Sequence, residues 1–222
     1  MSEAHTITSP WPDSTLGRGQ GPLVLDGSRG EGGGQVLRTS LALAVMGVRE
    51  LHIENIRAKR SRPGLLRQHL TAVRAAARIS NAEVEGDELY SSSLRFRPQS
   101  IVHGDYRFAV GTAGSATLVL QTILMPLLVA PGRSRLRIEG GTHNQAAPTY
   151  DYLDRVFFPC LRKMGATLHA ELPRAGFFPA GGGVLEVELE GGPVLRRFDL
   201  LERGAFVEGR AGNPSFRPRF KL

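Results

Sequence analysis

A glycine-rich turn that carries one carboxylate is the first stretch whose residue types could do chemistry. The apolar run Leu23–Leu25 ends at Asp26, and apolar residues return at helical spacing after Gly30-Glu31-Gly32-Gly33-Gly34. Free N–H groups in the first turn of a helix favour an anion, and glycine lets the backbone approach it closely. Arg38 adds a positive charge there. The stretch predicts a strand, an anion-binding turn and a helix that buries Val36, Leu37, Leu41, Ala44 and Val45.

Glu31 decides how this turn is interpreted. No Gly-Lys-Ser/Thr follows the glycines, so the turn is not a P-loop, and a dinucleotide-binding fingerprint fits loosely because Gln35 takes the third glycine's place. A carboxylate beside a phosphate-binding helix start is repulsive unless a metal ion or a cation neutralises it. We therefore interpret Glu31 as a metal or substrate contact. The alternative is a structural turn with a solvated glutamate.

A long basic stretch follows the glycine turn. The chain has a formal net charge of +7 and a sequence pI of about 10.3, which indicates an anionic partner. No Asp or Glu occurs between Asn55 and Ala82. A solvated helix face explains part of the stretch, but the loop from Arg57 to Arg62 has no acidic residue nearby. The basic residues are Arg57, Lys59, Arg60, Arg62, Arg67, Arg74 and Arg78.

Composition restricts the class of protein. The 222 residues, of which 41% are hydrophobic and 22% charged, are typical of a soluble globular protein. Cys160 is the single cysteine, so no internal disulfide forms, and a reducing compartment is expected. Residues 1–22 lack the apolar core of a secretory signal, and the longest apolar run, Val119–Ala130, is too short to span a membrane. We expect a cytoplasmic protein without a membrane partner.

The chain uses one pattern of strands and helices twice. Ile53 aligns with Ile138 and Pro63 with Pro148, and both separations are 85 residues (138 − 53 and 148 − 63). We predict an α/β (α+β) fold of two βαβαββ units, residues 23–100 and 105–190, each a four-stranded sheet with two helices on one face. The units should pack helix against helix. Residues 1–22 are predicted as a loose extension, and 194–222 as the start of an incomplete third unit with an irregular tail.

Periodicity and turn residues give the expected elements. The first unit has strands at 23–25, 51–56, 82–85 and 93–96, one helix ending at Gly47 and another opened by Pro63, with His69 on its buried stripe. The second unit has strands at 105–110, 135–139, 167–171 and 184–189, and a helix over 116–129. A strand at 197–201 would begin the third unit. The helix opened by Pro148 should bury Leu153, Val156, Phe157, Cys160, Leu161 and Met164.

Several long strings resemble the bacterial type of the RNA 3'-terminal phosphate cyclase family. The resemblance is carried by LDGSRGEGGGQVLRTSLAL, IRAKRSRPGLLRQHLTAV and DYRFAVGTAGSATLVLQT, and GGTHNQAAPTYDY and FFPAGGG support it. It runs from about Leu23 to Gly204. The resemblance implies the fold that this family shares with enolpyruvyl transferases, in a chain that is truncated at its C-terminus.

The family resemblance also implies a reaction and its residues. An ATP-dependent enzyme of the ligase class would pass AMP from ATP through an enzyme histidine to an RNA 3'-terminal phosphate. The neighbouring 2'-hydroxyl would then attack, giving a 2',3'-cyclic phosphate and free AMP. Divalent metal (Mg or Mn) and arginines would offset the charge. By position, Glu31 corresponds to a carboxylate near metal and triphosphate, Arg38, Arg57 and Arg60 to phosphate-binding arginines, and Gln121 and Pro148 to nucleotide contacts.

The nucleophilic histidine of the family matches no histidine of this chain, so no catalytic residue is predicted. His143, shortly before Pro148, is the sole candidate for a substitute. Two alternatives to the cyclase hypothesis stay open: a catalytically inactive remnant that binds RNA 3' ends or nucleotide without turnover, and a relative of the enolpyruvyl transferases. The histidines of the chain are His5, His52, His69, His103, His143 and His169.

Overall fold

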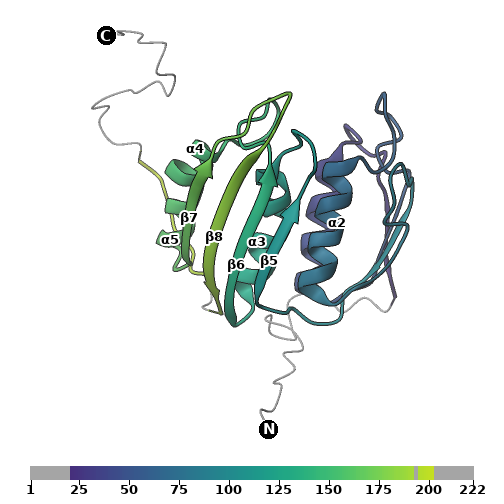
Figure 1. The fold of residues 1–222 in the computed structure, drawn as a ribbon. Helices are drawn as coiled ribbons and strands as arrows, with labels where there is room; N and C mark the ends of the chain where they lie inside the picture. Colours follow the sequence, from purple (N-terminus) through teal and green to yellow (C-terminus); the bar gives the residue numbers. More distant parts are fainter. Residues whose placement is uncertain (1–20, 193–194, 203–222) are drawn as a thin grey trace.

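A computed structural model describes residues 21–192 and 195–202, which form two four-stranded sheets and a set of helices (Figure 1). The two units follow the same order of strands and helices, except that three short helical segments take the place of the second helix in the second unit. The first consists of β1 (Leu23–Asp26), α1 (Gly34–Gly47), β2 (Leu51–Glu54), α2 (Arg67–Ser80), β3 (Glu83–Glu85) and β4 (Leu94–Arg97). The second consists of β5 (Asp105–Ala109), α3 (Ala116–Val129), β6 (Gly132–Gly140), α4 (Tyr150–Tyr152), the π-helical turn η1 (Leu153–Phe157), α5 (Phe158–Lys163), β7 (Thr167–Arg174) and β8 (Gly183–Gly191).

Both sheets have the same topology. Their strand orders are β1-β2-β4-β3 and β5-β6-β8-β7. In each sheet the first two strands are parallel, with Leu25 opposite Ile53 and Phe108 opposite Ile138, and the other neighbours are antiparallel. A parallel pair needs a crossover connection, which α1 and α3 supply. The structure confirms the predicted α/β class, and the chain uses one βαβαββ arrangement twice.

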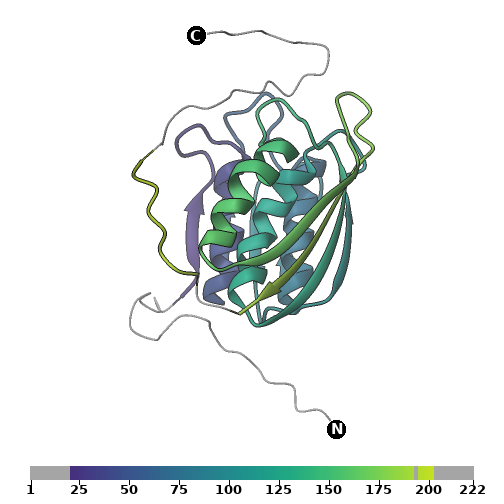
Figure 2. The same ribbon diagram turned by 90° about the vertical axis from the view of Figure 1, so that its left-hand side faces the viewer.

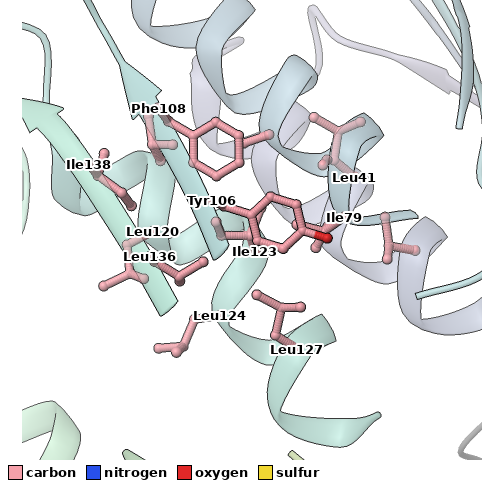
Figure 3. Close-up of a cluster of buried hydrophobic side chains, with 14 of the residues drawn as sticks. Leu41, Ile79, Tyr106, Phe108, Leu120, Ile123, Leu124, Leu127, Leu136 and Ile138 are labelled. Carbon is pink, nitrogen blue, oxygen red and sulfur yellow. The ribbon is translucent and has the colours of Figure 1, made fainter. Parts of the chain in front are cut away.

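Helix-to-helix packing joins the two units. Helices α1, α2 and α3 contact one another, and they gather at the centre of the molecule (Figure 2). Leu41 and Ile79 of the first unit lie in the same buried cluster as Phe108, Ile123 and Leu127 of the second (Figure 3). Because this cluster is continuous, removal of its apolar surface from water stabilises both units together.

Helix α2 begins at Arg67, four residues after the proline that was predicted to open it. The segment before it makes backbone bonds elsewhere: Gly64 N–H donates to the Ile56 carbonyl at 2.8 Å, and Leu65 N–H to the Ser91 carbonyl at 3.0 Å. Gly64 has a φ of 75°, outside the helical region. These bonds fix residues 63–66 as a loop that leads to the helix.

The helix after Pro148 also departs from its predicted pattern. It begins at Tyr150 with Thr149 as the N-cap, and a π-helical turn follows over Leu153–Phe157. A π turn adds a residue to the helical repeat and rotates the side chains that follow. Val156 is consequently 48% exposed, Phe158 is fully buried in its place, and Cys160 is only partly buried. The predicted stripe was wrong for Val156.

Residues 195–202 form neither helix nor strand, so the strand expected at 197–201 is absent from this part of the chain. A strand needs a neighbour for its backbone bonds, and here Arg196 N–H donates to the carbonyl of Met164, the C-cap of α5, instead. The predicted division at 1–22 and 194–222 falls mostly outside the described residues and stays a prediction. None of the helices over 21–192 is long and apolar enough to cross a membrane.

Candidate phosphate and nucleotide site

The glycine turn leads into α1 without a side-chain cap. Asp26 Oδ1 accepts the Ser28 N–H at 2.9 Å, and this bond lowers the pKa of the Asp26 carboxyl. Gly30 and Gly32 have φ values of 58° and 55°, which glycine adopts without strain. Gly33 is the N-cap of α1, and no side chain bonds to the first turn. The N–H groups of that turn can therefore bind an anion.

Arg38 and His69 are buried against this helix start. Their exposed fractions are 9% and 8%. A Cβ on Gly34 would overlap the His69 ring and lie 2.8 Å from Arg38 Nη1. Burial lowers the pKa of the Arg38 guanidinium, and its Nε has no hydrogen-bond partner among the described residues. A buried unpaired donor beside a helix start is suited to an anionic ligand.

His69 is a neutral ring with a defined tautomer. Burial, together with the nearby charges of Arg57 and Arg38, lowers the pKa of His69 to about 4. Nδ1 accepts the Leu66 N–H at 3.3 Å. The neutral ring therefore carries its proton on Nε2, the atom that faces Gly34. The structure confirms that His69 is buried, and it also places a hydrogen-bond donor at the glycine turn.

The basic loop contacts the glycine turn through Arg60. Its Nη2 lies 3.5 Å from Glu31 Oε2 and would lie 3.0 Å from a Cβ on Gly33. Arg57 instead donates to the carbonyls of Arg62 at 2.6 Å and Gly64 at 2.8 Å, so it braces the loop. The interpretation that no acidic residue balances this loop was wrong for Arg60 alone, which Glu31 reaches from 29 positions earlier in the sequence. The structure thus brings together the four residues predicted to contact phosphate or metal, namely Glu31, Arg38, Arg57 and Arg60.

The residues of the turn fit only one kind of metal site. Over residues 21–192 and 195–202 no group of three or more His, Cys, Asp or Glu gathers to hold an ion. Glu31 is a single carboxylate, and its side chain is 95% exposed. Mg²⁺ is often bound by one or two carboxylates together with substrate phosphates. Glu31 therefore fits a metal that is bound jointly with a triphosphate.

Gln121 and Pro148 both belong to the second unit, and each is related to Thr117 of α3. Thr117 Oγ1 donates to the Pro148 carbonyl at 2.7 Å. Gln121 is exposed one helical turn after Thr117 and on the same face of α3. Ser115 caps this helix by accepting the Leu118 N–H at 3.2 Å, and its hydroxyl lies 2.7 Å from Thr117 Oγ1. The start of α3 thus positions the segment that contains Pro148.

Gln68 connects the two groups of residues. Its Oε1 accepts the Ser115 N–H at 2.6 Å, so a run of hydrogen bonds leads from the residue beside His69 to Pro148. Sequence reasoning missed Gln68, Ser115 and Thr117. A serine between a glycine turn and an apolar run is an N-cap signal that could have identified Ser115. Gln68 offered no signal, because its partner lies 47 positions away.

His143, the candidate for a substitute nucleophile, has a hydrogen-bond partner on each of its ring nitrogens. His143 Nε2 lies 2.8 Å from Asp151 Oδ2, and its Nδ1 lies 2.8 Å from Thr142 Oγ1. Both ring nitrogens are occupied, so the neutral ring has no free lone pair. Of the other described histidines, His69 is buried. His52 is paired with Glu50, His103 with Ser134 and His169 with Glu171. His5 lies outside the described residues.

Comparison with known proteins identifies the family. The family model described as RNA 3'-terminal phosphate cyclase matches residues 29–207. An RNA 3'-terminal phosphate cyclase of Koribacter versatilis (strain Ellin345) is 53% identical over 194 residues, covering 87% of this chain and 55% of the relative. The protein of the same name from Salmonella enteritidis PT4 is 52% identical over 182 residues, covering 82% and 54%. The chain spans about half the length of these curated relatives.

Among solved structures, an EPSP synthase from Acinetobacter baumannii aligns with a TM-score of 0.37 and 11% identity, covering 78% of this chain and 48% of that one. The family model matches one continuous stretch of the chain, from residue 29 to residue 207. It includes the glycine turn, the basic loop, the start of α3 and the Pro148 segment, which are the parts that form the site. The chain belongs to the RNA 3'-terminal phosphate cyclase family.

Proposed function

We propose that the protein binds RNA that ends in a 3'-phosphate and acts in its ATP-dependent conversion to a 2',3'-cyclic phosphate. The observation that carries this proposal is the meeting of Arg38, Arg60 and His69 at the uncapped start of α1. These groups offer two cations, a neutral N–H donor and free backbone N–H groups, which together suit a terminal phosphate. The names of the relatives support RNA as the substrate.

The chemistry of the site would offset negative charge. A phosphate monoester is a poor electrophile because it is anionic. Transfer of AMP from ATP, with loss of pyrophosphate, would supply the RNA phosphate with AMP as the leaving group for attack by the 2'-hydroxyl. Arg38 and Arg60 would bind the phosphate oxygens, since a guanidinium matches their geometry. Arg57 would contribute charge while it braces the loop. Glu31 would share a divalent ion with the triphosphate of ATP.

The nucleotide would lie against the second unit. We assign Gln121 and Pro148 to the nucleotide, because Thr117 places the Pro148 segment beside the helical face that presents Gln121. The Gln68–Ser115 bond would hold this side in a fixed relation to the phosphate side. A fixed relation matters because both reacting phosphates must meet at one point.

A second candidate function is binding without turnover. The arrangement of His143, whose two ring nitrogens are both occupied, favours it for the described residues. In this case the chain would bind RNA 3' ends and nucleotide but would not accept AMP itself. The two functions share one phosphate site, so a binding test addresses the part common to both.

Binding of RNA ending in a 3'-phosphate or a 3'-hydroxyl tests the proposal. Arg60→Ala should weaken binding of the 3'-phosphate end roughly 10- to 100-fold and barely change the 3'-hydroxyl end, because a charge-assisted bond is lost. Arg60 is the better single variant since Arg57 also holds the loop. Arg135→Ala on the exposed face of β6 removes the same charge and is the control. Equal weakening for both ends would contradict the proposal.

A further inference from the structure

We propose that Phe177 and Phe178, in the loop between β7 and β8, form a stacking platform for bases of single-stranded RNA upstream of its 3'-terminal phosphate. The inference rests on the proposed function, from which it takes RNA as the ligand. The two residues are consecutive in the chain, and they are 57% and 82% exposed. Neighbouring exposed aromatic rings offer π-faces on which any base can stack, as single-strand binding without sequence preference requires.

The loop that carries these rings is anchored at its base. The Gly176 carbonyl accepts the N–H groups of Thr142 at 2.9 Å and His143 at 3.2 Å, and Gly176 N–H donates to Thr142 Oγ1 at 2.9 Å. Across the loop, Gly181 N–H donates to the Phe177 carbonyl at 2.7 Å. A platform already held in place loses little conformational entropy when a base stacks on it.

His143 fixes the orientation of the first ring. The rings of His143 and Phe177 are stacked, with centroids 5.0 Å apart and planes inclined by 22°. His143 is itself held by Asp151 and Thr142. One face of Phe177 is therefore covered, while over half of its surface stays exposed to a further ring. This stack gives His143 a positioning role in RNA binding that does not need a free ring nitrogen.

Contacts lead from the platform to the phosphate site. The loop packs on residues 112–113, because a Cβ on Gly181 would lie 2.8 Å from the Ala113 Cα and the Thr112 carbonyl oxygen. Ser115, shortly after them, bonds to Gln68 beside His69. Figure 1 shows the β7–β8 loop rising beyond the end of its sheet.

A positive charge lies along this path. Arg67 is exposed, and its Nη1 would lie 3.9 Å from a Cβ on Gly111, in the same small-residue turn that the β7–β8 loop packs on. An RNA backbone that leaves the phosphate site towards the platform would pass this charge. Alternation of basic groups with aromatic rings is the arrangement that tracks a single strand.

The platform is assigned to RNA bases rather than to the adenine of ATP. Two consecutive rings suit successive bases of a strand, whereas ATP has a single base. The proposed contacts of ATP lie on α3 and on the Pro148 segment, which Thr117 holds. If the platform binds RNA bases, affinity should rise with RNA length. A separate measurement of ATP binding tests whether the platform binds adenine instead.

The experiment measures the affinity of the protein for three ligands: a nucleoside 3'-monophosphate, a 3'-phosphate RNA of about five nucleotides, and ATP. About five nucleotides lies within the usual site sizes of single-strand binding proteins. The double variant Phe177→Leu and Phe178→Leu keeps apolar side chains but removes both rings. It should weaken binding of the RNA roughly 10-fold and leave the monophosphate and ATP unchanged. The matched double variant with tyrosine keeps the rings and should bind like the unchanged chain.

Leu43→Ala, which removes an exposed apolar side chain of α1, is the control for general surface effects. Unchanged RNA binding by the leucine double variant with a native circular dichroism spectrum would overturn the inference, and so would an equal loss of ATP binding. If RNA shows no preference for a 3'-phosphate but still loses affinity in the leucine variant, the platform stands and the proposed function fails. If the preference persists and the leucine variant binds normally, the platform alone fails.

Discussion

Gln68 Oε1 accepts the backbone N–H of Ser115 at 2.6 Å, and this bond joins the first turn of α2 in one unit to the cap of α3 in the other. His69, the next residue, faces the glycine turn, and Ser115 leads to Thr117 and Pro148. This hydrogen bond therefore links the proposed phosphate side to the proposed nucleotide side. Its loss would affect both stability and the relation of the two sides.

We expect Gln68→Ala to lower the free energy of unfolding by about 1 to 3 kcal/mol, because the partly buried Ser115 N–H would lose its partner. Urea denaturation followed by circular dichroism measures this change. Arg67→Ala, at the exposed neighbouring position, should change the free energy by less than about 0.5 kcal/mol. Equal stabilities of the two variants would show that the Gln68 bond contributes nothing.

His69 should make the protein less stable in mild acid. The unfolded chain binds this proton with the ordinary pKa of 6.5 and the folded chain only near 4. Between these values the unfolded state holds more protons, so stability falls as the pH falls from about 6.5 to 4, by on the order of 3 kcal/mol. Burial also lowers the pKa of His103, which contributes in the same direction.

NMR titration of the His69 ring resonances separates its contribution from that of His103. A midpoint near 4 is expected, and a midpoint near 6.5 would show that the ring is hydrated in the folded protein. His69→Gln should also reduce the loss of stability between pH 6.5 and 4. An unchanged pH dependence in this variant would contradict the assignment.

Gly34→Ala tests the close approach at the start of α1. The added Cβ would overlap the His69 ring, so we expect a loss of about 1 to 3 kcal/mol in the free energy of unfolding and weaker binding of 3'-phosphate ends. Gly47→Ala, at the other end of the same helix, meets no atom within 4 Å. It should be neutral or stabilise the protein by about 0.4 to 1 kcal/mol. Similar behaviour of both variants would refute the predicted steric conflict.

Local patterns predicted much of this fold. The apolar run after the small-residue turn predicted a helix over 116–129, and α3 has those bounds. The alternating pattern at 105–110 predicted β5, which ends at Ala109. These elements were predictable because the periodicity of a segment directly reflects which of its faces is buried.

Contacts between distant segments were beyond the reach of the sequence. Arg60 meets Glu31, and Gln68 meets Ser115, across separations of 29 and 47 residues. The π-helical turn that exposes Val156 has no signature in residue spacing. The candidate arginines could be selected from composition and resemblance, but the burial of Arg38 and the bracing role of Arg57 depend on packing.

The chain should not label itself with AMP. Attack on the α-phosphorus of ATP needs a neutral imidazole with a free, aligned lone pair. His143, the sole substitute candidate, has Asp151 and Thr142 on its two nitrogens. Incubation with α-labelled ATP and divalent metal, followed by denaturing electrophoresis, should give no acid-labile label on the protein. Label that disappears in His143→Ala would overturn this expectation.

The central claim is that the start of α1 binds a terminal phosphate, and an NMR titration with a nucleoside 3'-monophosphate tests it most directly. We predict that the largest amide shifts fall on Gly33, Gly34 and Gln35, whose N–H groups lie at the uncapped helix start. They should shrink in Arg60→Ala and persist in the Arg135→Ala control. Largest shifts on the exposed face of the β5–β8 sheet, with none at the helix start, would contradict the account.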